Sequence, residues 1–257
     1  MIAAPSLQAL LRQELQGQER PPAVILTGHN GSGKSTLWYR LLANELKMPL
    51  VNADRLTLSI LPETRDGLGT LDLPPWAQEL RDTDERWQRV SQSGVRLFRQ
   101  VIMEQRLPFA FETVFSHWKL LPDGTYESKI DDLKQMRQAG YFVVLVFVGL
   151  TAPELSMLRV RSRKALGGHD VPTDKLLERF PRTQAAIRQA APLADLTLMV
   201  DNSLDRLPFQ FVRAQRKRTV LYDARDPRYA TDPVLLATTG QWLEKVAGPF
   251  RGARARA

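Results

Sequence analysis

The sequence predicts an α/β fold, with a mainly parallel sheet flanked by helices, and three of its features indicate this class. Short apolar segments typical of strands alternate with longer segments of helical spacing, which is the pattern of βαβ units. The run at 141–148 is apolar at every position, as expected of a strand covered on both faces. A glycine-rich segment at 28–35 joins the first such strand to the first helical segment.

The individual elements follow from local pattern. Strands are expected at 23–27, 50–52, 109–112, 141–148 and 196–200, where short apolar runs occur, and 211–223 predicts an antiparallel edge strand. Helices are expected at 35–46, 129–139, 153–166 and 233–247. A further helical segment covers about 76–101, and its large apolar residues fall on one face: Trp76, Leu80, Trp87, Val90, Leu97 and Val101.

The composition is that of a globular protein, with 257 residues, 43% hydrophobic and 25% charged. The absence of cysteine excludes disulfides, thiolate catalysis and cysteine-based zinc sites, and it fits a cytoplasmic location. The first residues show no signal peptide, and the longest apolar run is far shorter than the roughly 20 residues of a membrane-spanning helix. We expect a soluble protein with one domain over 1–250 and a basic tail at 251–257.

Residues 28–35 fit the pattern G-x-x-x-x-G-K-S of a phosphate-binding loop (P-loop) between a strand and a helix. The glycines let backbone N–H groups point at an anion, and the helix that begins near Lys34 adds its positive end. Lys34 would reach the β- and γ-phosphates, and the Ser35 hydroxyl would help to hold Mg²⁺. The sequence therefore predicts binding of ATP or GTP with Mg²⁺. The residues expected at the nucleotide are Gly28, Asn30, Gly31, Ser32, Gly33, Lys34, Ser35 and Thr36.

Polar residues follow the second and third strands, at the sheet edge where open parallel sheets bind their ligands. Asp54 either accepts a proton from an attacking hydroxyl or caps the next helix, two roles that sequence position alone does not separate. Its neighbour Arg55 is a candidate substrate-binding residue. Glu112 and Thr113 end the third strand, and strand alternation favours the cleft, where they would contact Mg²⁺ through water or orient the substrate.

An arginine cluster follows the fourth strand, and it predicts a lid over about 159–182. Arg159, Arg161 and Arg163 precede the glycine pair at 167–168, and arginines on a mobile lid would neutralise transition-state charge. The alternative is a solvated basic helix face. His169 is interpreted as a residue that orders this loop. After the fifth strand, Asn202 is predicted to flank the adenine base, although the segment could be an ordinary turn.

The net charge of +8 attracts phosphate-bearing partners without identifying them. The basic run 213–218 favours a nucleic-acid-associated kinase or ATPase, but it contains no aromatic residue of the kind that single-strand readers use. A nucleotide-gated binding module, with hydrolysis as a timer, is a third hypothesis because it needs no acceptor. The first hypothesis is a small-molecule kinase.

These motifs together resemble the zeta-toxin family of P-loop kinases. The resemblance rests on GHNGSGKST at 28–36, NADR at 52–55, FETVFS at 111–116, the strand at 139–150, RVRSRKALGGHDVP at 159–172, RFPR at 179–182 and the strand that ends at Ser203. The lid sequence Gly167-Gly168-His169 resembles that of a shorter branch of the family. The segment 61–80 differs from the substrate region of the better-known toxins, which leaves the acceptor open.

The resemblance implies an ATP-dependent kinase that phosphorylates a hydroxyl of UDP-N-acetylglucosamine or another nucleotide sugar, and a toxin held inactive by an antitoxin protein. Asp54 matches the catalytic base of the family, and Lys34 and Ser35 match its phosphate and magnesium residues. Glu112 and Thr113 match its substrate-side strand end, and Arg163 looks like its lid arginine. No membrane partner is implied, and nucleic acid is a weaker candidate.

Overall fold

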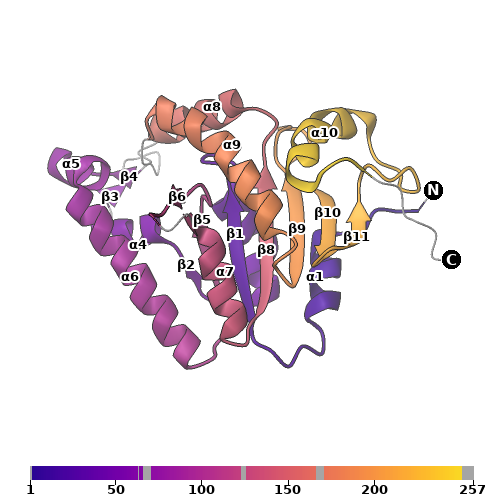
Figure 1. Cartoon of the computed structure of the whole chain (residues 1–257). Helices are drawn as coiled ribbons and strands as arrows, with labels where there is room; N and C mark the ends of the chain where they lie inside the picture. Colours follow the sequence, from indigo (N-terminus) through magenta and orange to yellow (C-terminus); the bar gives the residue numbers. More distant parts are fainter. Residues whose placement is uncertain (1, 63, 66–70, 123–125, 166–170, 251–257) are drawn as a thin grey trace.

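The computed structural model describes residues 2–62, 64–65, 71–122, 126–165 and 171–250. A seven-stranded sheet in the order β11-β10-β9-β8-β1-β5-β2 forms its centre (Figure 1). The β2–β5, β5–β1, β1–β8 and β8–β9 pairs are parallel, and β10 and β11 continue the sheet in antiparallel pairing. The prediction of a mainly parallel sheet flanked by helices is confirmed.

The strands of this sheet are β1 (Pro22–Gly28), β2 (Leu50–Val51), β5 (Phe109–Thr113), β8 (Phe142–Gly149), β9 (Leu196–Asp201), β10 (Gln210–Arg216) and β11 (Thr219–Asp223). Two small hairpins are β3 (Thr64–Arg65) with β4 (Leu71–Asp72), and β6 (Trp118–Leu120) with β7 (Tyr126–Ser128). The helices are α1 (Leu7–Leu15), α2 (Lys34–Leu37), α3 (Ala43–Leu46), α4 (Ala53–Ser59), α5 (Pro75–Thr83), α6 (Glu85–Glu104), α7 (Lys129–Gln138), α8 (Pro153–Ala165), α9 (Thr173–Ala190) and α10 (Pro233–Ala247). None of these helices combines the length and the apolar composition needed to cross a bilayer.

The core lies around the central strands because their side chains are apolar on both faces. Every residue of β8 is buried, as its continuous apolar run predicts, and β1 is buried from Ala23 onward. In Figure 1, α7 and α9 cross in front of these strands. Because the strands are parallel, their carboxyl ends meet at one edge of the sheet, and the phosphate loop follows β1 at that edge.

The helix expected after the phosphate loop forms as one continuous helical segment with an internal change of pitch. A π-helical turn, η1 (Trp38–Leu42), lies between α2 and α3. Such turns carry one extra residue and are frequent near functional sites. Trp38 and Leu42 are buried in the core, whereas Tyr39 is 47% exposed.

The segment 76–101 differs from the single helical segment that was predicted. It forms two helices, because Asp84 caps α6 by accepting hydrogen bonds from the backbone N–H groups of Arg86 and Trp87. The apolar face that the spacing identified is largely exposed, since Trp76, Val90 and Leu97 are each more than half accessible. Helical spacing identified the apolar stripe, but α6 lies at the end of the sheet, where little covers it (Figure 1).

The segment 211–223 forms a hairpin of two antiparallel strands where a single edge strand was expected. The chain reverses at Lys217, whose φ of 51° lies in the left-handed region. The basic run 213–218 lies in β10 and in the turn that follows it, and two of its arginines are paired with carboxylates. Arg213 is buried and paired with Asp223, and burial lowers the pKa of the Arg213 guanidinium. Arg216 donates to both carboxylate oxygens of Glu14.

We expect Asp223→Asn to destabilise the fold by about 3 kcal/mol, because it leaves the buried Arg213 charge without a carboxylate. The Asp223 side chain is 1% exposed and also accepts from Arg225 at 2.8 Å. Urea denaturation of the variant measures the loss. Asp205→Asn is the matched control: Asp205 is 98% exposed in its pair with Arg159, so we expect it to cost less than about 1 kcal/mol. Equal losses for the two variants would contradict this account.

Candidate nucleotide and catalytic site

The phosphate loop connects β1 to α2 and depends on glycine at two positions in particular. Gly28 has a φ of 153°, and a Cβ there would lie 2.4 Å from the Val148 carbonyl oxygen. Gly33 has a φ of 89°, and a Cβ there would lie 2.7 Å from the amide nitrogen of Asn202. Neighbouring backbone and side chains therefore approach the loop so closely that a larger residue would displace them. The loop has the compact form that the motif predicts.

Three side chains, two from α2 and one from the end of β2, meet at the carboxylate of Glu112 near the end of β5. Ser35 Oγ donates to Glu112 Oε2 at 2.8 Å, and Asn52 Nδ2 donates to the same oxygen at 2.7 Å. Lys34 Nζ lies 3.9 Å from Glu112 Oε1, and it also donates to the carbonyls of His29 and Gly28. The Lys34 side chain is 7% exposed and that of Glu112 13%, so this charge pair is shielded from solvent.

The cap of α4 is Asn52. Its Oδ1 accepts from the backbone N–H of Arg55 at 3.2 Å, and its carbonyl accepts from the N–H of Leu56. Asp54 therefore lies inside the first turn of α4, directly after β2, and the capping position that was its alternative role is occupied by Asn52. The Asp54 side chain lies outside what the structure describes, so its role as a base stays a prediction.

The other predicted residues lie around this cluster. Arg55 is exposed, and its guanidinium stacks on Tyr39 at 5.0 Å from the ring centroid. Thr113 is half-buried and pairs in register with Thr27 of β1. Thr36 is exposed on α2, one residue after Ser35.

Helix α8 packs directly against the phosphate loop. Ser156 Oγ donates to the Asn30 carbonyl at 2.6 Å, and a Cβ on Gly31 would lie 3.1 Å from the Cβ of Arg159. Arg159 donates to the Asn202 carbonyl and to Asp205. Arg163, one turn further along, is exposed. The predicted lid residues Gly167, Gly168 and His169 lie outside the described residues, so the lid stays a prediction.

Asn202 braces the phosphate loop from the end of β9. Its Nδ2 donates to the Ser32 carbonyl at 2.9 Å, and its Oδ1 accepts from the backbone N–H of Phe209. Both ends of the amide are used for these contacts, and the residue is 8% exposed. The adenine contact predicted for Asn202 stays a prediction, while the observed geometry supports a role in positioning the loop.

Sequence reasoning missed His29, which joins the phosphate loop to α9. Its ring stacks on Phe180 at a centroid distance of 3.7 Å and contacts the edge of Phe147 at 5.8 Å. It is 2% exposed, and among the described residues neither ring nitrogen has a hydrogen-bond partner. Burial and the nearby Lys34 charge lower the pKa of His29 to about 3. No local pattern signals this contact, because Phe180 is distant in sequence.

His29 predicts a loss of stability in acid. Its pKa falls from 6.5 to about 3 on folding, so the unfolded chain binds the proton first and stability declines as the pH drops below 6.5. Between pH 7 and pH 5 this contributes about 2 kcal/mol of destabilisation. We expect His29→Gln to lose this pH-dependent difference in unfolding free energy, measured by urea denaturation at pH 7 and pH 5. His117→Gln, at an exposed histidine, should show the same difference as the wild type. An unchanged pH slope in His29→Gln would contradict this assignment.

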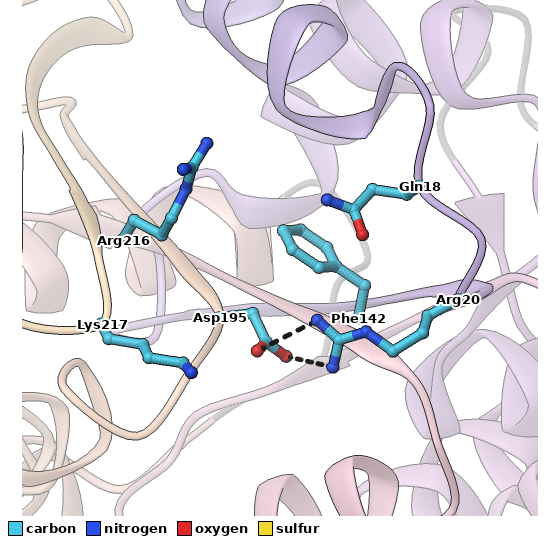
Figure 2. A pocket seen from close by; sticks show the side chains of 6 residues that line it. All are labelled: Gln18, Arg20, Phe142, Asp195, Arg216 and Lys217. Carbon is cyan, nitrogen blue, oxygen red and sulfur yellow. Dashed lines mark hydrogen bonds and ion pairs between the residues drawn. The ribbon is translucent and has the colours of Figure 1, made fainter.

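A small cavity of about 240 Å³ lies away from the phosphate loop, near the amino ends of β8 and β9. Figure 2 shows the Arg20 guanidinium facing the Asp195 carboxylate within it. The two nitrogen–oxygen distances of this pair are 3.3 Å and 3.5 Å. Asp195 is 3% exposed and also accepts from the backbone N–H of Val143. These contacts tie the segment that follows α1 to the sheet.

A glycine-rich loop between a parallel strand and a helix, beside an acidic strand end, defines a P-loop fold of the kinase type. The model of the Zeta toxin family matches residues 8–226. The chain therefore belongs to the zeta toxin family. Membership supports a kinase that uses a nucleotide and leaves its acceptor open.

Individual relatives are distant. An uncharacterized protein of Haemophilus influenzae is 25% identical over 158 residues, which cover 62% of this chain and 91% of that protein. A structure of the PezAT toxin-antitoxin system of Streptococcus pneumoniae aligns with a TM-score of 0.51 at 15% identity, over 95% of this chain and 86% of that one. A structure of AvrRxo1-ORF1:-ORF2 with ATP aligns with a TM-score of 0.56 at 15% identity, over 94% of this chain and 68% of that one. These structural likenesses show the fold.

Proposed function

We propose that the protein is an ATP-dependent phosphotransferase that transfers the γ-phosphoryl group of ATP to a hydroxyl of a small molecule. The observation that carries this proposal is the contact of Ser35, Asn52 and Lys34 with one carboxylate, Glu112. A phosphate loop alone would serve any nucleotide-binding protein. The convergence of groups from the ends of β1, β2 and β5 on one acidic group supports a site for a second substrate beside the nucleotide.

The side chains present fit Mg²⁺. Ser35 Oγ and the Glu112 carboxylate are hard oxygen donors 2.8 Å apart, and Mg²⁺ usually takes one or two protein oxygens together with substrate phosphates. Among the described residues no cluster of three or more histidine, aspartate or glutamate side chains forms a metal site, which suits an ion held chiefly by phosphates. Ser35 and Glu112 would hold the ion, which when bound neutralises charge on the phosphate oxygens.

In the proposed reaction Asp54 takes the proton of the acceptor hydroxyl as its oxygen bonds to the γ-phosphorus. The bond from that phosphorus to the β-phosphate oxygen breaks, and ADP leaves. Lys34 neutralises charge on the phosphates, Glu112 and Thr113 orient the reacting groups, and Arg163 approaches from the lid. Arg55 binds the acceptor.

The family points to UDP-N-acetylglucosamine or another nucleotide sugar as the first acceptor to test. The PezAT relative is part of a toxin-antitoxin system, so an antitoxin protein is a proposed partner of this chain as well. Growth arrest on expression, relieved by a cognate partner, would support that part of the proposal. A cytoplasmic location is proposed with it.

The test is incubation of the protein with γ-labelled ATP and a panel of nucleotide sugars, simple sugars, nucleotides and RNA. We expect label on a hydroxyl compound with wild-type protein and none with Asp54→Ala. Stoichiometric ATP hydrolysis without a labelled product would instead favour the nucleotide-gated module. Steeply salt-dependent RNA binding would favour the nucleic-acid alternative. The pairing of Arg213 and Arg216 with carboxylates makes the basic run a weaker argument for that alternative, while the net charge of +8 remains.

A further inference from the structure

A groove of about 750 Å³ runs along β2, the end strand of the sheet. The helical segment after the phosphate loop forms one wall of the groove, and α4 with α6 forms the other. Figure 1 shows β2 at this end of the sheet with α4 and α6 beside it. Sites for small molecules have volumes of roughly 300–1,000 Å³, so the groove has the size of one.

The lining of the groove is chiefly apolar, with side chains such as Met48, Leu56, Val95 and Ile102. Phe98 also lines it and is 55% exposed, although aromatic side chains favour burial. Its hydrogen-bonding side chains include Tyr39, Asn52, Arg55 and Ser59, and apolar side chains make up most of the rest. Its chemistry therefore fits an alkyl or aryl group better than a sugar.

One end of the groove meets the candidate catalytic cluster. Asn52 lines the groove and donates to Glu112, and Arg55 lines it while stacking on Tyr39. Among the described residues Arg55 has no carboxylate partner. A molecule lying in the groove would thus have its polar end beside the groups proposed to transfer the phosphoryl group.

We propose that this groove is the acceptor subsite of the kinase, and that it takes an alcohol with an apolar body whose hydroxyl lies at the Asn52 end. This inference rests on the proposed function. It narrows the acceptor to amphipathic alcohols and ranks them above nucleotide sugars. Phe98 is a specificity-determining residue on this account, because its ring would contact the apolar body.

The test compares methyl and phenyl β-D-glucoside, which differ in the apolar group alone. Calorimetric titration should give phenyl glucoside an affinity about tenfold higher, as expected for burial of one ring. Phe98→Ala should abolish this ratio, and Phe98→Leu should restore part of it. The matched control is Leu97→Ala, since Leu97 is 64% exposed on the same helix and outside the groove. It should keep the wild-type ratio.

Transfer from labelled ATP is measured on the same proteins, with UDP-N-acetylglucosamine included. Labelling of phenyl glucoside with a KM that rises in Phe98→Ala would support the acceptor role. Transfer to any compound together with an affinity ratio near one would overturn the groove assignment and leave the proposed function standing. If phenyl glucoside bound about tenfold more tightly than methyl glucoside but no alcohol was phosphorylated, the acceptor role and the proposed function would both be overturned.

Discussion

Replacing Asp54 with alanine or asparagine is expected to lower the rate of phosphoryl transfer by about 10³-fold while ATP still binds. The physical reason is that a positioned base contributes roughly 10²–10⁴-fold to such a step, whereas the nucleotide is held by the phosphate loop. Asp54 lies in the first turn of α4 directly after β2, and Asn52 takes the capping contact. Stopped-time assays with labelled ATP measure transfer, and fluorescence titration with a nucleotide analogue measures binding.

Two controls separate chemistry from folding. Glu85→Gln changes a surface carboxylate that is 85% exposed in its pair with Arg89, and it should leave transfer unchanged. Urea denaturation of Asp54→Asn should give a single cooperative unfolding transition, which shows that the variant protein is folded. Transfer at the wild-type rate by a folded Asp54→Ala protein would refute the role of the base.

The second large effect is expected for Glu112→Gln, which keeps the shape of the side chain and removes its charge. We expect transfer to fall about 10- to 100-fold, with a higher Mg²⁺ concentration needed for half-maximal rate, because the proposed ion site loses a charged oxygen donor. Ser35 and Asn52 would lose a charged acceptor, and Lys34 its counter-charge at 3.9 Å. Rates measured across a Mg²⁺ titration test this directly.

Glu127→Gln is the matched control for this variant. Glu127 is 55% exposed in its contact with His117, distant from the phosphate loop in sequence, and its neutralisation should change neither the rate nor the Mg²⁺ dependence. If Glu112→Gln kept the wild-type Mg²⁺ requirement, the proposed link between this carboxylate and the ion would be wrong, even if the rate fell.

Local patterns predicted much of the fold because each depends on neighbours in sequence. The continuous apolar run of β8, the alternation of strands with helices, and the glycine motif at 28–35 all carry their meaning within a few residues. The exposure of the apolar face of α6 could not be predicted, for the complementary reason. Periodicity shows which side chains of a helix share a face, but whether another layer covers that face depends on the place of the helix in the fold.

Some residues of the candidate site could likewise be predicted from the sequence, whereas their contacts could not. The motif identified Lys34 and Ser35, and strand ends identified Glu112. The capping contact of Asn52 takes the place of the capping role that sequence position had left open for Asp54, whose role as a base stays a prediction. The pairing of the basic run with Glu14 and Asp223 was likewise unforeseen. The number of charged residues in a sequence does not show which of them form ion pairs in the fold.

The sequence by itself determined the parallel α/β class, the phosphate loop and the family, because these are written in short segments whose geometry is local. Only the tertiary structure decided that His29 stacks on Phe180, that Asn202 braces Ser32, and that an apolar groove opens beside Asn52. Each of these joins residues far apart in the chain. Such contacts depend on how the elements pack in three dimensions, which no single segment encodes.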